Sequence, residues 1–240
     1  MAEKENKKFK FKQILSLKEG IFLSIEIITP LIFCIIFGCR DWINLIGAQI
    51  GIVSIFFLAK ASLLGISLSF VFSLFYAITS LNYKYYGEAI IYFAFMIPLG
   101  ITSAIIWIIN RFKKTAEVTI VKTKKIDFVI GPIASVILTF GLFWLLRYLG
   151  TQNIITSTIS LFTSFLALYF QLRRSRFTEI FFAANDIVLI TLWILATIDD
   201  ISYLPIVICF VFLLVNDLYG FFNWSKIQKE QEMILAEENN

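Results

Sequence analysis

Four polar and two aromatic side chains stand inside the last two long apolar stretches of the chain, where they could contact a solute. They are Asn185, Asp186, Trp193, Asn216, Asp217 and Tyr219. Polar groups inside a membrane are costly, so they normally face a helix bundle or a wet cavity. An amide beside an aromatic ring suits a planar heterocycle that bears hydroxyl groups, because the rings stack and the amide forms hydrogen bonds.

The spacing of these residues places some of them together. Asn185 and Trp193 are eight residues apart, about 2.2 helical turns, and so lie within roughly 80° of each other on one helix face. Asn216 and Tyr219 are neighbours on a helix surface. We interpret Asn185, Trp193 and Asn216 as cavity-lining residues. The competing interpretation is that the amides bond helix to helix as structural contacts.

The acidic residues leave three roles open. Asp186 and Asp217 could balance a cationic solute, accept a coupling proton, or lie protonated in a bond between helices. Glu26 is interpreted as a structural contact, and Gln49 as either cavity-lining or structural.

Asn223 and Trp224 come at the end of the last apolar stretch. Aromatic residues in that position often sit at the membrane–water interface, so we expect an anchoring role there.

Enzyme chemistry finds no support in the residue types. The chain has no histidine, which removes imidazole catalysis and histidine metal sites. Cys34, Cys39 and Cys209 are not in metal-ligand spacing. Phosphate loops, HExxH and nucleophile-elbow motifs are missing from the sequence. We expect no catalytic residues, no metal and no cofactor.

The elements that position these residues are membrane-spanning helices. The composition is 59% hydrophobic and 16% charged, against about 25% charged in soluble domains. A spanning helix needs roughly 17–25 mostly apolar residues. Eight stretches qualify: 21–38, 42–59, 61–81, 89–110, 127–146, 153–172, 177–197 and 203–224. The sequence therefore predicts an all-α integral membrane protein with eight transmembrane helices.

The basic residues predict the orientation. With the N-terminus in the cytoplasm, 18 of the 21 Lys and Arg residues fall inside, and only Arg40, Lys84 and Arg147 fall outside. This is the positive-inside pattern of a multi-pass protein of the cell membrane with both termini cytoplasmic. The cytoplasmic parts would be the basic tail 1–20, the basic loop 111–126 and the tail 225–240. The acidic end of that last tail is expected to be solvated and frayed, with Glu230, Glu232, Glu237 and Glu238. Such clusters are typical of contact with anionic membrane lipids, not with nucleic acid.

The helices also suggest an internal repeat. Residues 42–110 and 153–224 each hold three helices, and they begin similarly with NLIGAQIGIVSIF and NIITSTISLFTSF. The helix 127–146 between them is a linker, so the two triplets are parallel repeats, as in SWEET-type transporters. The helix 21–38 lies outside this 3+1+3 plan and is expected to be peripheral.

Three motifs resemble those of PnuC-type transporters. LVNDLYGFFNW at 214–224 is similar to the closing motif of that family, and NDIVLITLW at 185–193 to its helix with Asn and Trp eight apart. YGE at 86–88, followed by Pro98 and Trp107, is similar to its fourth-helix pattern. The resemblance covers about residues 42–224.

The resemblance implies uptake of nicotinamide riboside by facilitated diffusion, with phosphorylation by a cytoplasmic kinase trapping the solute. It also implies a homotrimer. Several positions linked to ligand contact in the family differ here: Tyr92 and Gly100 replace an Asn and a Gln, Phe72 stands where an Asn is common, and Thr178 and Phe181 replace a Trp pair. Tyr92 therefore joins the candidate substrate-binding residues.

Because of these differences the ligand stays open among related solutes. Thiamine, riboflavin or a deoxynucleoside, which other members of the superfamily carry, are the alternatives. A SWEET-like sugar carrier is a further alternative, since aromatic stacking also suits sugars.

Overall fold

The computed structural model describes residues 16–38, 41–115 and 117–238. Within these residues the chain is helical apart from short connections and two isolated backbone bridges. The helices are α2 (Leu17–Phe37), α3 (Trp42–Leu58), α4 (Leu63–Asn82), α5 (Tyr86–Ile90), η1 (Ile91–Met96), α6 (Ile97–Ile109), η2 (Phe112–Lys114), α7 (Asp127–Leu149), α8 (Ile154–Leu172), α9 (Phe177–Asp199), η3 (Ile201–Tyr203) and α10 (Leu204–Glu238).

The predicted spans are present, with shifted ends. Seven helical segments among the described residues are long and apolar enough to cross a membrane, and α3, with 17 residues, is a shorter apolar helix. Capping side chains decide where several helices begin. Ser16 and Glu19 form a capping box that starts α2 four residues before the predicted boundary. Asp41 and Ser62 are N-caps of α3 and α4, where their side chains accept hydrogen bonds from backbone N–H groups of the first turn.

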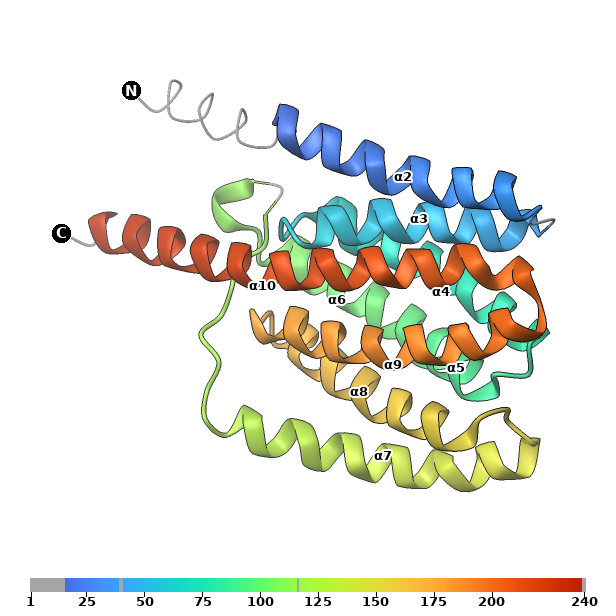
Figure 1. Cartoon of the computed structure of the whole chain (residues 1–240). Coiled ribbons are helices and arrows are strands. Elements are labelled where there is room, and N and C mark those ends of the chain that lie inside the picture. The colour runs from blue at the N-terminus through green and yellow to red at the C-terminus, as the bar shows by residue number, and fades with distance from the viewer. Residues whose placement is uncertain (1–15, 39–40, 116, 239–240) are drawn as a thin grey trace.

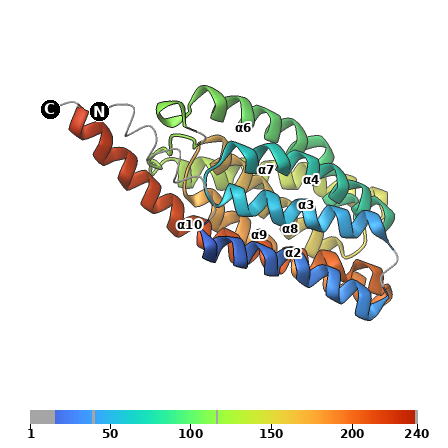
Figure 2. The ribbon, with the colours of Figure 1, turned by 90° about the horizontal axis from the view of Figure 1, so that it is seen from above.

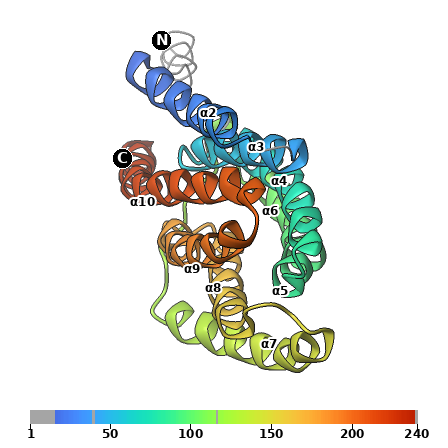
Figure 3. The ribbon, with the colours of Figure 1, turned by 45° about the vertical axis from the view of Figure 1, so that its right-hand side comes forward.

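The long helices run side by side in one bundle, with α2 and α7 on opposite flanks (Figures 1 and 3). Between these flanks α3 packs against α4, α4 against α6, α8 against α9, and α9 against α10. The two groups meet where α10 packs against α3. Helix α2 packs mainly on α3 and α10, and most of its side chains face outward. Figure 2 shows α2 beside α3 along most of its length.

One predicted span is interrupted. The stretch predicted as a single helix over 89–110 is built from α5, the π-helical segment η1 and α6. Pro98 lies at the start of α6, where its missing N–H removes a normal helix bond. The wider π turn carries Tyr92, and short π segments in helices are frequent at functional sites.

The expectation that the acidic end of the C-terminal tail is frayed is wrong for the described part. Helix α10 continues without a break to Glu238. Gln231 of this extension binds the backbone of the connecting loop, since its Nε2 donates to the Val118 carbonyl at 3.0 Å and its Oε1 accepts from the Ile120 N–H at 2.9 Å. The Gln231 side chain holds the extension in place, because it forms hydrogen bonds with backbone groups of the loop that have no partner in a helix.

The basic loops gather at one end of the bundle, called here the terminal end because α2 begins and α10 ends there (Figure 1). Backbone hydrogen bonds join the Val118 N–H to the Ala61 carbonyl and the Val121 N–H to the Arg174 carbonyl. The loops that the charge pattern places on one side therefore touch each other. Arg40, Cys39 and most of the basic tail 1–20 lie outside the described residues.

Candidate functional site

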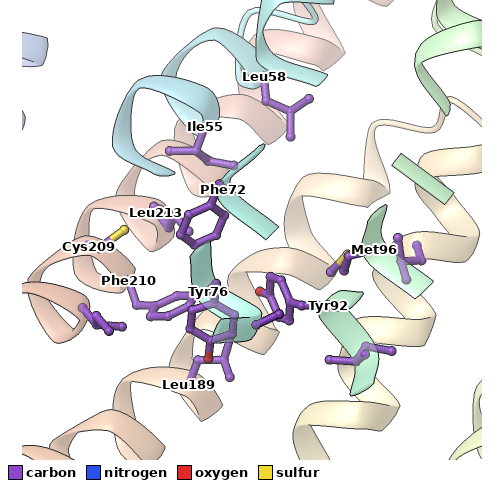
Figure 4. Packing of buried hydrophobic residues seen from close by; sticks show 14 of the residues in the cluster. Ile55, Leu58, Phe72, Tyr76, Tyr92, Met96, Leu189, Cys209, Phe210 and Leu213 are labelled. Carbon is purple, nitrogen blue, oxygen red and sulfur yellow. The ribbon is translucent and has the colours of Figure 1, made fainter. Parts of the chain in front are cut away.

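A small cavity of about 60 Å³ lies in the middle of the bundle, between the group α3, α4, η1 and α6 and the group α8, α9 and α10. Its walls include Phe72 and Tyr92 from one group and Asp186 and Asp217 from the other. Figure 4 shows Phe72 and Tyr92 converging with other buried rings at this point. Three of the residues predicted to bind solute, Tyr92, Asp186 and Asp217, are therefore brought together.

The acidic residues of this region form a buried group. The Asp217 carboxyl lies against those of Asp186 and Glu179, and all three side chains are at most 3% exposed. Gly220 makes room for the Glu179 side chain, since a Cβ at that position would lie 2.6 Å from its Oε2. Ionisation of all three carboxyl groups is disfavoured when they are buried so close together, and a shared proton or a nearby cation relieves the repulsion.

Trp193 lies next to the cavity but does not line it. Its Nε1 donates to the Tyr76 hydroxyl at 2.6 Å. The Tyr76 ring lies 4.2 Å from that of Tyr92 and 5.2 Å from that of Phe210. Tyr83 extends this aromatic cluster towards the end opposite the termini, where its hydroxyl donates to the Asp199 carboxylate. The cluster closes that side of the cavity with packed rings.

Asn185 makes contacts between helices in the structure. Its Oδ1 accepts hydrogen bonds from the hydroxyl groups of Ser160, Thr163 and Ser164 on α8, at 3.3, 2.7 and 3.2 Å. Asn185 and Trp193 do share the inner side of α9, since both are at most 1% exposed. The oxygen of this amide is occupied by α8.

Asn216 faces α2 instead of the cavity. Its Nδ2 donates to the Glu26 Oε1 at 2.5 Å and to the Phe212 carbonyl at 2.9 Å. Gln49 also holds α2, because its Nε2 donates to the Ile27 carbonyl at 3.0 Å. These contacts agree with a structural interpretation of Glu26 and Gln49.

Tyr219 lies elsewhere. It is 47% exposed and lines a separate pocket of about 210 Å³ at the terminal end, together with Lys60 and Glu19. Asn216 and Tyr219 are neighbours along α10 but face different surroundings. The structure thus separates Tyr219 from the central cavity.

Trp224 is not an interface anchor, contrary to the expectation from its position. It is fully buried, with its Nε1 donating to the Leu58 carbonyl at 3.0 Å, and its ring lies 5.5 Å from that of Trp107. Asn223 is likewise engaged, since its Nδ2 donates to the Ala59 carbonyl at 2.9 Å. Both side chains are held in the interior by the end of α3, and Trp224 also by Trp107 of α6.

Comparison with known proteins places this arrangement in a family. The model of the "Nicotinamide mononucleotide transporter" family matches residues 41–226. The chain belongs to this family. The nicotinamide riboside transporter PnuC of Neisseria mucosa is 25% identical over 199 residues, which cover 81% of this chain and 76% of that protein. The PnuC-type resemblance read from the motifs is confirmed, and the family is one of membrane transporters, not enzymes.

A solved structure shares the fold. The crystal structure of the vitamin B3 transporter PnuC superposes with a TM-score of 0.81, covering 93% of this chain and 97% of that one at 22% identity. The family match begins at residue 41, after α2.

The positions that differ from the family's usual residues fall in two places. Gly100 and Phe72 line the cavity beside Tyr92. Thr178 and Phe181 do not line it in this structure: Thr178 is fully buried, and Phe181 stacks on Phe170 with 4.7 Å between ring centroids.

Two buried acids were missed by sequence reasoning. Glu179 and Glu88 are both fully buried, the Glu179 carboxyl against Asp217 and the Glu88 carboxyl against Ser160. Both occur in the first turn of a helix, where an acidic residue is ordinarily read as complementing the helix dipole. The only signal was their position beside apolar runs.

Proposed function

We propose that this chain is a carrier that moves nicotinamide riboside by facilitated diffusion, with a cytoplasmic kinase trapping the solute by phosphorylation. The observation that carries the proposal is the central cavity, where Phe72 and Tyr92 face Asp186 and Asp217 across two helix groups. Rings can stack on the pyridine ring, and oxygen atoms can meet the polar parts of the solute. The name of the relative from Neisseria mucosa supports the same solute.

The cavity volume indicates how such a carrier would work. At about 60 Å³ it is smaller than the roughly 300–1,000 Å³ of small-molecule pockets, so the helices must part to admit a riboside. We propose that α3–α6 and α8–α10 are the two parallel repeats of a 3+1+3 plan, with α7 as the linker. Rocking of one repeat against the other would open the cavity to each side in turn.

Closure in the present structure would come from aromatic residues on both sides. The cluster around Trp193 lies towards one end, and the pair Trp107 and Trp224 towards the other. In this scheme both termini are cytoplasmic, basic loops contact anionic lipid head groups, and the protein assembles as a homotrimer.

Binding and uptake by the purified chain test the function. Nicotinamide riboside should bind, and in proteoliposomes it should equilibrate across the membrane without a response to a proton gradient. Riboside kinase and ATP enclosed in the vesicles should convert equilibration into accumulation. Clear binding of thiamine, riboflavin or a deoxynucleoside, with none of nicotinamide riboside, would refute the proposed solute.

A matched pair of variants ties the function to the cavity. Tyr92→Ala should lose most of the binding, roughly tenfold or more, because stacking contributes about 1 kcal/mol beyond buried area. Tyr148→Ala should bind like the unchanged chain, since Tyr148 is 86% exposed on α7. Equal binding by both variants would place the solute elsewhere.

A second candidate is proton-coupled uptake, favoured by the contact between Asp217, Asp186 and Glu179. In that case uptake should rise when the side from which the solute enters is made more acidic, and Asp217→Asn should abolish this response. Uptake that ignores the gradient would exclude coupling.

A further inference from the structure

We infer that the central cavity selects solutes whose ring carries a positive charge, and that Asp186 and Asp217 provide the selecting negative charge. The inference deepens the proposed carrier function and rests on it. The cavity would distinguish a positively charged ring from a neutral ring of the same shape, and Asp186 and Asp217 would make this distinction.

The first support is the balance of buried charge. Every buried charged side chain among the described residues is acidic: Glu26, Glu88, Asp127, Glu179, Asp186 and Asp217. Only Asp127 has a basic partner in this part of the chain, with Arg173 Nε at 3.1 Å from its Oδ1. A buried carboxylate without a counter-ion is strongly disfavoured. A cationic solute supplies the missing charge, and a neutral one does not.

The second support is the set of acids that line the cavity. Asp186 Oδ2 and Asp217 Oδ1 are buried, belong to side chains that line the cavity, and receive no hydrogen bond from an amide, hydroxyl or basic group among the described residues; the two carboxyl groups contact only acids. Glu26 differs, because Asn216 donates to its Oε1 and it lies outside the cavity lining. Glu179 is outside the lining too, behind Asp217. Asp186 and Asp217 are therefore the two acids that an occupant of the cavity would meet.

The third support is the opposite wall. Phe72 and Tyr92 line the same cavity, with ring centroids 6.2 Å apart and planes at 88°. An aromatic face attracts a cation through its quadrupole, most strongly in a site without water. Rings on one side and carboxyl groups on the other suit a flat organic cation. A metal ion fits poorly, since no three acidic, cysteine or histidine residues in the described chain are placed to hold one.

The contact between the acids affects how they respond to charge. Like charges so close together disfavour full ionisation of Asp217 and its two acidic neighbours. A cation in the cavity favours the ionised form of the Asp186 and Asp217 carboxyl groups, and their negative charge in turn strengthens binding of the cation. A neutral ring of the same shape receives no such added affinity.

Two forms of one solute separate charge from shape. Nicotinamide riboside has a positively charged ring, whereas its 1,4-dihydro form is neutral and nearly the same size. Binding of each to the purified full chain should differ by at least about tenfold in favour of the cation, a ratio that corresponds to 1.4 kcal/mol. Asp186→Asn and Asp217→Asn should each weaken binding of the cation about tenfold or more and leave binding of the neutral form nearly unchanged.

Glu26→Gln is the matched control, because it neutralises a buried carboxyl outside the cavity. It should keep the preference for the cation. Equal binding of the two forms, or a preference that survives both Asp→Asn changes, would overturn the inference while leaving the proposed function intact.

If the proposed function is wrong, neither form of the riboside will bind. In that case binding of cationic thiamine, neutral riboflavin and neutral deoxynucleosides is measured to test the selection for charge. Binding of thiamine would support charge selection with another solute. Binding of a neutral member, or of none, would contradict it.

Discussion

Trp193 has a different position in the structure from the one that the sequence predicts. The spacing from Asn185 predicts that both line a cavity, yet Trp193 holds the aromatic wall behind Tyr92 through its bond to Tyr76. A ring that positions another ring can affect solute binding without touching the solute. A change at Trp193 should therefore lower the stability of the protein directly, and should weaken solute binding only through the position of Tyr92.

Trp193→Phe tests this positioning role. The change keeps an aromatic ring but removes the Nε1 donor, which costs about 1–3 kcal/mol when it leaves the buried Tyr76 hydroxyl without that donor. The melting temperature in detergent should fall by several degrees. Trp144→Phe is the control, because Trp144 is 56% exposed on α7, and it should melt like the unchanged chain. Equal melting temperatures for both variants would contradict the role.

At the scale of elements, the extension of α10 has a defined task. Gln231 binds the backbone of the connecting loop at Val118 and Ile120, two residues that are themselves buried. The same loop is bonded to the turn between α3 and α4 and to the turn between α8 and α9. The extension thus ties both helix groups together at the terminal end.

Hydrogen exchange can measure this tie. In Gln231→Ala the Ile120 amide loses its acceptor, so its exchange should become roughly tenfold faster or more, in line with one or two lost hydrogen bonds. Gln228→Ala is the matched control on the same helix, because the Gln228 Nε2 donates only along α10, to Glu232 Oε1 at 2.9 Å. Protection of Ile120 that is equal in the two variants would exclude the tie.

At the scale of the whole molecule, the charged ends set the expected orientation. Lys84 lies at the end opposite the termini, while Lys125 belongs to the basic loop at the terminal end. The positive-inside pattern places the first outside the cell and the second inside. Native cysteines at 34, 39 and 209 must be replaced before labelling.

Labelling of single cysteines in intact cells then reads the orientation. Lys84→Cys should react with a membrane-impermeant maleimide, and Lys125→Cys should react only after the cells are made permeable. The opposite pattern would invert the proposed orientation of the chain. Reaction of both in intact cells would contradict the predicted topology.

Much of the fold could be read from the sequence because lipid imposes a simple rule. Every backbone group in a membrane must be bonded within the structure, so apolar runs of sufficient length become helices. The runs located all the spanning elements, and the motifs at 185–193 and 214–224 located the family. Helix ends were less certain, since they depend on local caps such as Ser16 and Asp41.

The tertiary structure alone decided which polar residues meet. Asp186 and Asp217 face the cavity, whereas Asn185 and Asn216, one residue earlier on the same helices, bond to α8 and to α2. One residue turns a helix by about 100°, so the choice depends on which neighbour packs against each face. The periodicity of the sequence cannot predict which neighbour packs against each face when a helix has neighbours on several sides. For the same reason it did not predict the burial of Glu179.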